Sequence, residues 1–257
     1  MSEPTIALYK DLKDKTVFVS GGATGIGASI VTAFCRQHAR VHFVDLNEAE
    51  GTALADGLAS QGLEKPVFSV CDVTRDESLC AAIDAADADG GLDVLVNNAA
   101  NDTRHKVEAV DADFWDRCVQ INLRHQFVAA QRAYRGMKPR GRGSIINFGS
   151  VAPRLGILDL SVYSTCKSAV KGLTRSLARE FGGAGIRVNS IVPGAILTPR
   201  QLELWITPDD EKRILGEQCL HRRLVGEDIA EMALFLASDA SSACTSQEFV
   251  VDGGLTG

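Results

Sequence analysis

The chain has 257 residues, 27 Lys and Arg against 33 Asp and Glu, a formal net charge of −6 and 45% hydrophobic residues. This length allows one large domain or two small ones, and the composition is typical of a packed globular protein rather than a disordered one. The acidic balance argues against a nucleic-acid partner, because affinity for nucleic acid comes largely from Lys and Arg.

Membrane, disulfide and metal signals are absent from the sequence. No apolar run reaches the roughly 18–20 residues of a transmembrane helix, and the first 15 residues are too polar for a signal peptide. We therefore expect a cytoplasmic protein without membrane attachment. The 7 cysteines form no Cys-x-x-Cys pair, and no two histidines stand four apart around a Glu, so we expect free thiols and no metal.

Seven short β-branched runs alternate with longer helical stretches along the chain. Most are apolar on both faces, which predicts a parallel sheet covered by helices on both sides and joined by right-handed crossovers. No repeat or linker divides residues 1–257, so a single domain is expected. The expected strands are Thr16–Ser20, Arg40–Leu46, Pro66–Val73, Leu92–Ala99, Ser144–Ser150, Arg187–Pro193 and Gln247–Asp252.

A glycine-rich turn follows the first expected strand, with the sequence Ser20-Gly21-Gly22-Ala23-Thr24-Gly25-Ile26-Gly27. Ile26, Ile30 and Phe34 then stand four apart, as on one face of a helix. Glycines suit a tight strand-to-helix turn whose backbone must closely approach a pyrophosphate. No Gly-Lys-Ser/Thr is present, which disfavours a P-loop nucleotide hydrolase. A turn without any ligand is the alternative interpretation.

Asp45 ends the second expected strand, about twenty residues after the turn, where a carboxylate can accept both hydroxyls of an adenosine ribose. The same carboxylate would repel a 2′-phosphate, and no arginine directly follows it. The sequence therefore favours NAD over NADP. The alternative is a solvated carboxylate at a strand end.

The second half of the chain supplies candidate reactive groups. After a predicted helix over Asp113–Tyr134, Ser150 follows an apolar strand, and Tyr163 and Lys167 share one face of a second helix over Ser161–Phe181. A lysine ammonium beside a phenol favours the phenolate, so we expect Lys167 to bring the pKa of Tyr163 closer to neutrality. The charged, proline-interrupted segment at about 198–221 is expected to be a mobile lid.

These motifs together resemble the short-chain dehydrogenase/reductase family, over nearly the whole chain. The resemblance implies an α/β, Rossmann-type, doubly wound fold with a seven-stranded parallel sheet, and nicotinamide-dependent carbonyl–alcohol chemistry. Ser20 and Ala100 depart from the usual threonine and glycine, each by a small change. The matching motifs are GGATGIG at 21–27, Asp72, NNAA at 97–100, Asn122, Ser150, Tyr163-x-x-x-Lys167 and Pro193-Gly194.

The resemblance also implies a role for each matched residue. Tyr163 would be the acid/base, Lys167 would lower its pKa and hold the nicotinamide ribose, and Ser150 would bind the substrate oxygen. Asn122 would sustain a water-linked proton relay through Lys167. The residues implied for the cofactor, with Asp72 and Val73 at the adenine and Asn98 and Ala99 at its ribose, are Gly21, Thr24, Gly25, Ile26, Gly27, Asp45, Leu46, Asp72, Val73, Asn98, Ala99, Tyr163, Lys167, Pro193, Gly194, Ile196 and Thr198.

Several local strings look like the sugar-oxidising branch of that family, the bacterial NAD-dependent aldose 1-dehydrogenases of D-xylose or L-arabinose type. These strings are residues 101–106, 122–125, 147–150 and 198–220. This likeness implies oxidation of an aldose such as D-xylose, L-arabinose or D-galactose at C1 to the lactone. It also implies a homotetramer built through the two long helices.

A polyhydroxylated substrate needs a polar pocket, because each hydroxyl that leaves water must regain hydrogen bonds. Trp205 would offer an apolar face to a sugar ring. Arg104 and His105 could instead cap the following helix or lie at a subunit contact, and Trp205 could pack inside the lid. The candidate substrate residues are Asn101, Arg104, Ser150, Asp159, Tyr163, Gln201 and Trp205.

Two other functions stay open. One is a short-chain enzyme acting on another secondary alcohol or a 3-oxoacyl thioester, although Asp45 argues against NADPH-driven reduction. The other is a nicotinamide-binding protein without turnover, against which the intact set of Ser150, Tyr163 and Lys167 argues.

Overall fold

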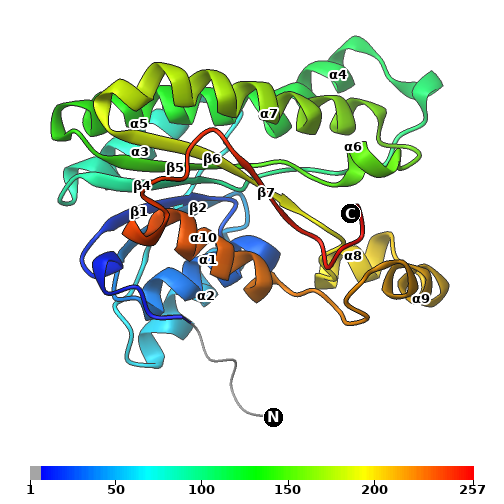
Figure 1. Ribbon diagram of the computed structural model, residues 1–257, viewed down its shortest axis with the longest axis horizontal. Helices are drawn as coiled ribbons and strands as arrows, with labels where there is room; N and C mark the ends of the chain where they lie inside the picture. The colour runs from blue at the N-terminus through cyan, green and yellow to red at the C-terminus, as the bar shows by residue number, and fades with distance from the viewer. Residues whose placement is uncertain (1–6) are drawn as a thin grey trace.

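The computed structural model describes residues 7–257, so the expectation about a signal peptide falls partly outside the described residues. Seven parallel strands in this part of the chain form one sheet in the order β3-β2-β1-β4-β5-β6-β7 (Figure 1). All seven expected strands are confirmed, as is the doubly wound α/β fold. The strands are β1 (Thr16–Ser20), β2 (Arg40–Asp45), β3 (Val67–Val70), β4 (Leu92–Asn97), β5 (Gly143–Phe148), β6 (Ile186–Pro193) and β7 (Glu248–Val251).

Helices cover both faces of the sheet, as the apolar strands predict (Figure 1). One apolar core joins the sheet to α1 (Gly25–Arg36), α2 (Glu48–Ser60) and α10 (Gly226–Ala237). A second core on the opposite face joins it to α3 (Asp76–Ala88), α5 (His125–Arg140) and α7 (Ser161–Phe181). Shorter elements are η1 (Lys10–Leu12), η2 (Val107–Ala109), α4 (Ala112–Val119), α6 (Ala152–Leu155), η4 (Gly182–Ala184), α8 (Pro199–Leu204), α9 (Pro208–Glu217) and η5 (Asp239–Ser241).

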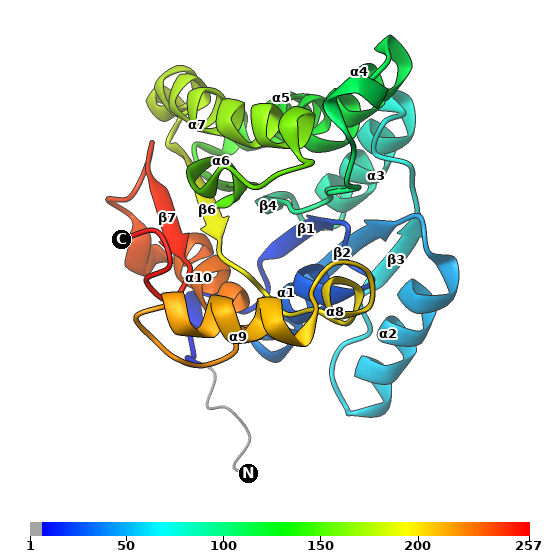
Figure 2. The ribbon, with the colours of Figure 1, turned by 90° about the vertical axis from the view of Figure 1, so that its right-hand side faces the viewer.

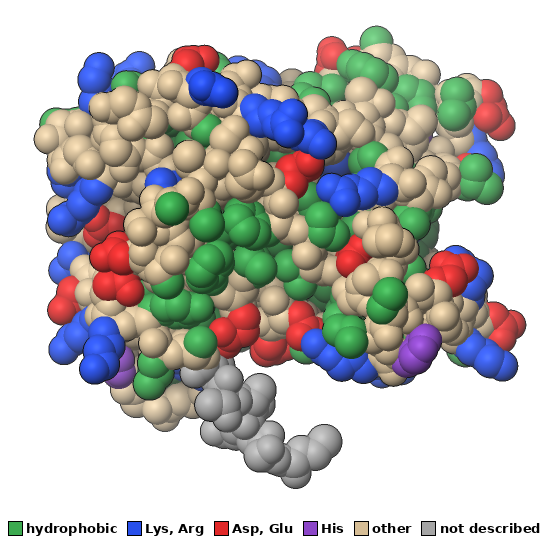
Figure 3. Space-filling model, viewed as in Figure 1, with side chains coloured by type: hydrophobic (Ala, Val, Ile, Leu, Met, Phe, Trp, Pro, Cys, Tyr) green, Lys and Arg blue, Asp and Glu red, His purple; other side chains and the backbone are tan. Residues whose placement is uncertain are grey.

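The expected strand at 66–73 is three residues too long at its carboxyl end. Cys71 and Val73 are buried, but they leave the sheet and turn toward the crevice at its edge. The two edge strands also depart from the rule of burial on both faces. Val67 and Val70 of β3 are about half exposed, and apolar side chains gather at the surface over β7 and α10 (Figure 3).

The single helix predicted over 113–134 is interrupted in the structure. A π-helical turn, η3 (Gln120–Arg124), separates α4 from α5. The Asn122 side chain donates a hydrogen bond to the Cys118 carbonyl oxygen at 3.0 Å, four residues earlier in the chain. Side-chain amides that bond the backbone in this way compete with the regular helical pattern, and they favour such a bulge.

The segment 198–221 is more ordered than its prolines suggested. Pro199 and Pro208 stand at the first positions of α8 and α9, where a missing N–H costs nothing. Thr198 and Thr207 cap these two helices through their side chains. The two prolines therefore begin helices rather than break one. Whether the segment moves as a lid stays a prediction.

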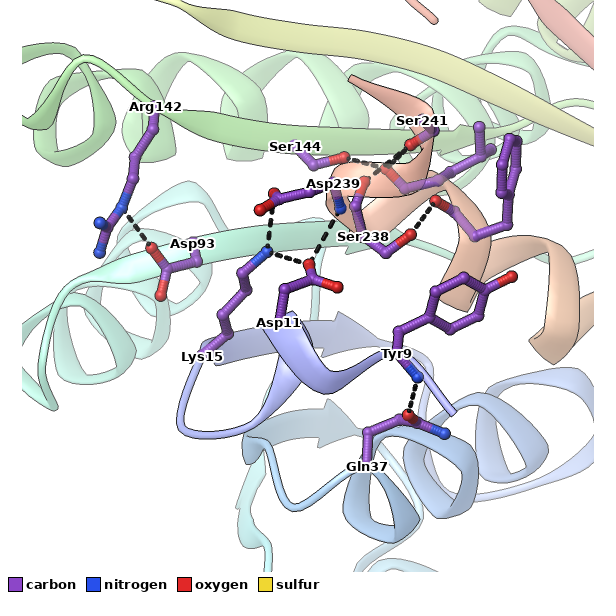
Figure 4. A network of polar contacts seen from close by, with 12 residues as sticks. Tyr9, Asp11, Lys15, Gln37, Asp93, Arg142, Ser144, Ser238, Asp239 and Ser241 are labelled. Atoms are coloured by element: carbon purple, nitrogen blue, oxygen red, sulfur yellow. Dashed lines mark hydrogen bonds and ion pairs between the residues drawn. The ribbon is translucent and has the colours of Figure 1, made fainter. Parts of the chain in front are cut away.

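Polar contacts tie the chain together at the amino-terminal ends of the strands (Figure 4). Lys15 Nζ contacts carboxylate oxygens of Asp11 at 2.8 Å and Asp239 at 3.3 Å. The hydroxyls of Ser144 and Ser241 both donate to the carbonyl oxygen of Leu236. These contacts close one end of the sheet, and the large opening lies at the other end. Within residues 7–257, no helix is long and apolar enough to cross a membrane.

Candidate active site

A cavity of about 1760 Å³ opens at the carboxyl ends of the strands. It lies where the strand order reverses between β1 and β4, which is the usual ligand position in open α/β sheets. α6 and α7 lie on one side of it, and α8 and α9 lie on the other (Figure 2). The right-hand side of the molecule is visibly hollowed there (Figure 3). Every residue predicted for the site lines this cavity except Asn122.

The glycine turn brings backbone very close to backbone. A Cβ on Gly27 would lie 1.9 Å from the Gly21 carbonyl oxygen, and one on Gly21, at φ +66°, would lie 2.8 Å from the Cα of Ala99. No side chain in the described part of the chain caps the start of α1 at Thr24. The first-turn N–H groups of α1 have no partner inside the helix, so they can bind an anion in the cavity.

Asn98 supports this turn more directly than the sequence indicated. Its Nδ2 donates to the carbonyl oxygens of Ser20 at 3.1 Å and Gly21 at 2.7 Å. The Ser20 hydroxyl, which replaces the usual threonine, accepts from the Ala99 N–H at 3.2 Å. Asn98 lines the cavity as expected, and its amide nitrogen also fixes the turn, while its placement at a ribose stays a prediction.

Two carboxylates, Asp45 and Asp72, line the cavity together with the glycine turn. Asp45 accepts from the backbone N–H of Ala23 at 3.0 Å and of Asn47 at 3.1 Å, one on each oxygen. Each oxygen keeps a further lone pair for a hydroxyl donor. Asp72 uses Oδ1 for the N–H and hydroxyl of Thr74. The free helix donors, the glycine cradle and these acceptors together fit a dinucleotide with a pyrophosphate and ribose hydroxyls.

The reactive residues lie together at the inner end of the cavity. Lys167 is buried and its Nζ donates to the Phe148 carbonyl oxygen at 3.0 Å, while lying 5.7 Å from the centroid of the Tyr163 ring. Burial raises the pKa of Tyr163 to about 12, and its hydrogen bond with Ser150 offsets only part of this rise. Burial also lowers the pKa of Lys167 to about 8.

The chain alone therefore does not lower the pKa of Tyr163 toward neutrality, as the sequence had led us to expect. Removal of water disfavours the phenolate, the charge of Asp102 adds to this effect, and the Ser150 hydrogen bond and the charge of Arg104 do not compensate for it. A further positive charge or a bound substrate is needed to bring the phenol into its working range.

Asn122 is fully buried but does not reach the cavity. Its side chain is occupied by the backbone of Asn101, accepting from the N–H at 2.9 Å and donating to the carbonyl oxygen at 3.0 Å. A relay through Asn122 would therefore have to use its backbone carbonyl oxygen, which accepts from Gln126 Nε2 at 3.2 Å.

Gln126 was not singled out from the sequence. Its amide nitrogen donates to the carbonyl oxygens of Asn122 and Phe148, and its Oε1 accepts from the Phe148 N–H at 3.2 Å. Phe148 O is also the acceptor for Lys167. Gln126 thus ties the peptide that holds Lys167 to the π-helical turn. Its position four residues after Asn122 on a helix was the one available signal.

The candidate substrate residues are brought to one wall of the cavity, but several are already occupied. Asp159, at φ +60°, pairs with Lys106 at 2.8 Å. The Asn101 side chain accepts from Thr103. Gln201 Nε2 donates to Asp102 at 2.7 Å.

Arg104 and Trp205 lie together, with the guanidinium carbon 5.5 Å from the indole centroid. The Trp205 face on that side is therefore covered by arginine rather than open to a sugar. His105 does not line the cavity, since its Nε2 accepts from the Val162 N–H at 3.2 Å near the start of α7. His105 does cap a helix, but that helix is α7 and not the one that directly follows His105 in the chain, as the sequence had suggested.

Asp102 is a second residue that the sequence did not single out. Besides Gln201, it pairs with Arg200 at 2.6 Å, which joins the loop after β4 to the start of α8. Ninety-eight residues separate Asp102 from Arg200 in the chain, and no local pattern connects them.

Comparisons with known proteins agree with this geometry. Residues 21–256 match a protein family described as enoyl-(acyl carrier protein) reductase. The chain is 45% identical to D-xylose 1-dehydrogenase of Caulobacter vibrioides, over 96% of this chain and 98% of that protein. It is equally 45% identical to a probable galactose dehydrogenase of Rhizobium meliloti, over 96% of this chain and 97% of that protein.

Solved structures give the same picture. A 3-oxoacyl-[acyl-carrier protein] reductase of Brucella melitensis with bound NAD superposes with a TM-score of 0.88, at 33% identity over 100% of this chain and 98% of that one. A mutant short-chain dehydrogenase/reductase of Serratia marcescens gives a TM-score of 0.88, at 32% identity over 96% of this chain and 100% of that one.

Proposed function

This chain belongs to the short-chain dehydrogenase/reductase family, and on this basis we propose that it oxidises an aldose sugar at C1 to the lactone with NAD as cofactor. Membership makes it an oxidoreductase that acts on CH–OH donors and uses NAD or NADP. The aldose and the choice of NAD are the proposed parts. The observation that carries the proposal is a polar wall, including Asp102, Arg104 and Gln201, in the same cavity as Ser150 and Tyr163.

In this proposal the chain's own residues remove one proton, that of the C1 hydroxyl. Tyr163, as phenolate, takes the proton of the C1 hydroxyl, and the Ser150 hydroxyl donates to the same oxygen as it becomes a carbonyl. Lys167 keeps a positive charge beside the phenol at pH values below about 8. A bound oxidised nicotinamide supplies the hydride acceptor and a further positive charge. Phe148 O and Gln126 hold Lys167 in place.

Asp45 supports the choice of NAD. Its two oxygens retain lone pairs for ribose hydroxyls, whereas a 2′-phosphate there would meet a carboxylate without an adjacent arginine. We propose that the remaining cofactor residues act as the resemblance implies, with Asn98 as a support for the glycine turn.

The same proposal includes a cytoplasmic enzyme that assembles as a homotetramer, with residues 198–221 moving as a lid. Assembly through α5 and α7 is supported by Phe127, a large apolar side chain that is 45% exposed on α5. Light scattering of the purified protein tests the subunit count.

A screen of NADH formation at 340 nm tests the function directly. Aldoses, cyclic polyols and 3-hydroxyacyl thioesters are compared with NAD and NADP in parallel. We expect activity on one or more aldoses with NAD. Activity restricted to acyl thioesters or other secondary alcohols would replace the aldose proposal, and a preference for NADP would refute the role given to Asp45. Tyr163→Phe should abolish turnover while NAD binding is kept, which distinguishes a catalyst from a binding protein.

A further inference from the structure

Two hydrogen-bond donors in the cavity wall are buried without acceptors. Within residues 7–257, neither Arg104 Nη1 nor Trp205 Nε1 has a hydrogen-bond partner, and both atoms are closed off from solvent. Arg104 also forms no ion pair in this part of the chain. Both residues line the cavity that holds Tyr163. A buried donor left unpaired destabilises the structure, so this wall is incomplete without a ligand.

The chemistry of these groups defines what would complete the wall. A guanidinium and an indole N–H only donate hydrogen bonds, and they accept none. The complementary ligand group is therefore an acceptor oxygen. Arg104, Trp205 and Tyr163 line the same cavity, so a small molecule that reaches Tyr163 can supply this acceptor.

The position of Trp205 depends on Asp102. Trp205 follows α8 directly, and the first turn of α8 is held by the contacts of Asp102 with Arg200 and Gln201. The Asp102 side chain is only 15% exposed. Burial alone would raise its pKa, but hydrogen bonds from Gln201 and Arg200 keep that pKa below the ordinary value. The carboxylate therefore stays ionised and the contact persists at neutral pH.

We infer that Arg104 and Trp205 are a specificity-determining donor pair, which binds hydroxyl oxygens of the substrate away from the oxidised carbon. Asp102 is a positioning residue that holds α8, and hence Trp205, against this part of the substrate. The inference rests on the proposed aldose oxidation and deepens it. In this inference Trp205 recognises the substrate through its indole N–H, which binds an oxygen, and not through the apolar ring face that the sequence suggested. A small adjustment of α8 would admit the hydroxyl between the two donors.

The test combines one isosteric variant with a series of substrates. Trp205→Phe removes the N–H and keeps an aromatic ring beside Arg104. The matched control is Trp115→Phe on α4, because the chain has only 2 tryptophans. The value of kcat/KM is measured for the best aldose and for each of its monodeoxy analogues, with wild type and both variants.

We expect Trp205→Phe to lower kcat/KM on the parent aldose about tenfold, the effect of about one lost hydrogen bond. On one particular monodeoxy analogue, the variant and wild type should be equal, because the oxygen that the N–H binds is already absent. Arg104→Met should behave likewise for the same or a neighbouring hydroxyl. Trp115→Phe should match wild type on every substrate.

Asp102→Ala tests the positioning role. In that background Trp205→Phe should have no further effect on the parent aldose, because the N–H is no longer held in place. A purely structural role would instead lower kcat/KM equally for all analogues and leave the effect of Trp205→Phe intact.

Failure of the inference can be separated from failure of the proposed function. If wild type oxidises aldoses but Trp205→Phe and Arg104→Met cost nothing, or cost the same on every deoxy analogue, the donor pair is refuted and the aldose activity stands. A strong preference of wild type for uronic acids over aldoses would assign Arg104 to a carboxylate and overturn the hydroxyl inference. If wild type oxidises no aldose, both fail together.

Discussion

Tyr163 is the residue whose ionisation controls the proposed oxidation. Burial raises its pKa to about 12, so at neutral pH only a small fraction is phenolate in the chain alone. Lys167, with a pKa lowered to about 8, stays charged through the neutral range. Below the apparent pKa of the phenol in the working complex, the reactive fraction falls tenfold for each pH unit.

The first prediction is a rise of kcat/KM for oxidation with pH from about 6 to 8, followed by a levelling as Lys167 loses its charge. Ser150→Ala should move the rising limb to higher pH as well as lowering the rate, because the Ser150 hydrogen bond lowers the pKa of Tyr163. Initial rates at saturating NAD across this range measure both. A flat profile from pH 6 to 8 would contradict the assignment of Tyr163 as the base.

At the residue scale, the sequence predicted which residues belong to the site better than it predicted the burial and contacts of their side chains. The spacing of Tyr163 and Lys167 predicted that they share a helix face, and they do. The spacing could not reveal that burial raises the pKa of the phenol, because desolvation depends on everything packed around it. Asp102 and Gln126 were missed because their hydrogen-bond partners lie far away in the chain, and those of Gln126 are backbone groups.

Among the elements, the strands were predicted best and the long helix before β5 least well. All seven strands were predicted from apolar runs that alternate with helical stretches, because a strand buried on both faces is a continuous run of apolar residues. The π-helical turn at Gln120–Arg124 leaves no such signal, since its apolar spacing resembles that of an ordinary helix. It depends instead on a side chain, Asn122, that bonds the Cys118 carbonyl and the Asn101 backbone.

The glycine turn between β1 and α1 supports a sharper prediction. Gly27→Ala would place a methyl group 1.9 Å from the Gly21 carbonyl oxygen and 2.7 Å from Asn98 Nδ2, so the turn must deform. We expect loss of measurable NADH binding by fluorescence titration, together with a lower Tm. The cause is displacement of the backbone donors at the start of α1.

A glycine in an ordinary helical environment is the matched control. Gly57 lies inside α2, and an added Cβ there meets nothing within 4 Å. Gly57→Ala should leave NADH binding unchanged and raise stability by up to about 1 kcal/mol, the usual gain from replacing a helical glycine. Equal effects of the two substitutions would show that the close approach at Gly27 has no role in binding.

At the scale of the whole molecule, topology explains why so much of the site could be found from sequence. Parallel strands bring all their carboxyl ends to one edge, so residues that follow different strands meet in one cavity. Asp45, Ser150 and Gly194 are far apart in the chain, yet each stands at the end of a strand or just after it. The wall facing them is formed by α8 and the loop after β4, whose pairing depends on long-range contacts.

His125 links the stability of the whole molecule to pH. It is fully buried at the start of α5, and in the described residues neither ring nitrogen has a well-aligned hydrogen-bond partner. Burial, together with the charge of Lys167, lowers the pKa of His125 to about 3. The unfolded chain takes up a proton here near pH 6.5, while the folded protein does not until about pH 3.

Stability should therefore fall as pH decreases below 6.5, by about 1.4 kcal/mol per pH unit from this one group. The pKa values of Asp102, Asp228 and Asp252 are also lowered, but these carboxylates destabilise the fold only below about pH 4, where the unfolded chain protonates them. The pKa of Glu231 is raised instead, so its protonation stabilises the fold in the lower part of the window from pH 6 to 4. The difference between wild type and His125→Gln in this window therefore isolates His125. Urea unfolding at several pH values should show the slope in wild type and lose it in His125→Gln, which cannot titrate. His221→Gln changes an exposed histidine and should keep the wild-type slope; an unchanged slope in His125→Gln would mean that another buried group takes up the proton.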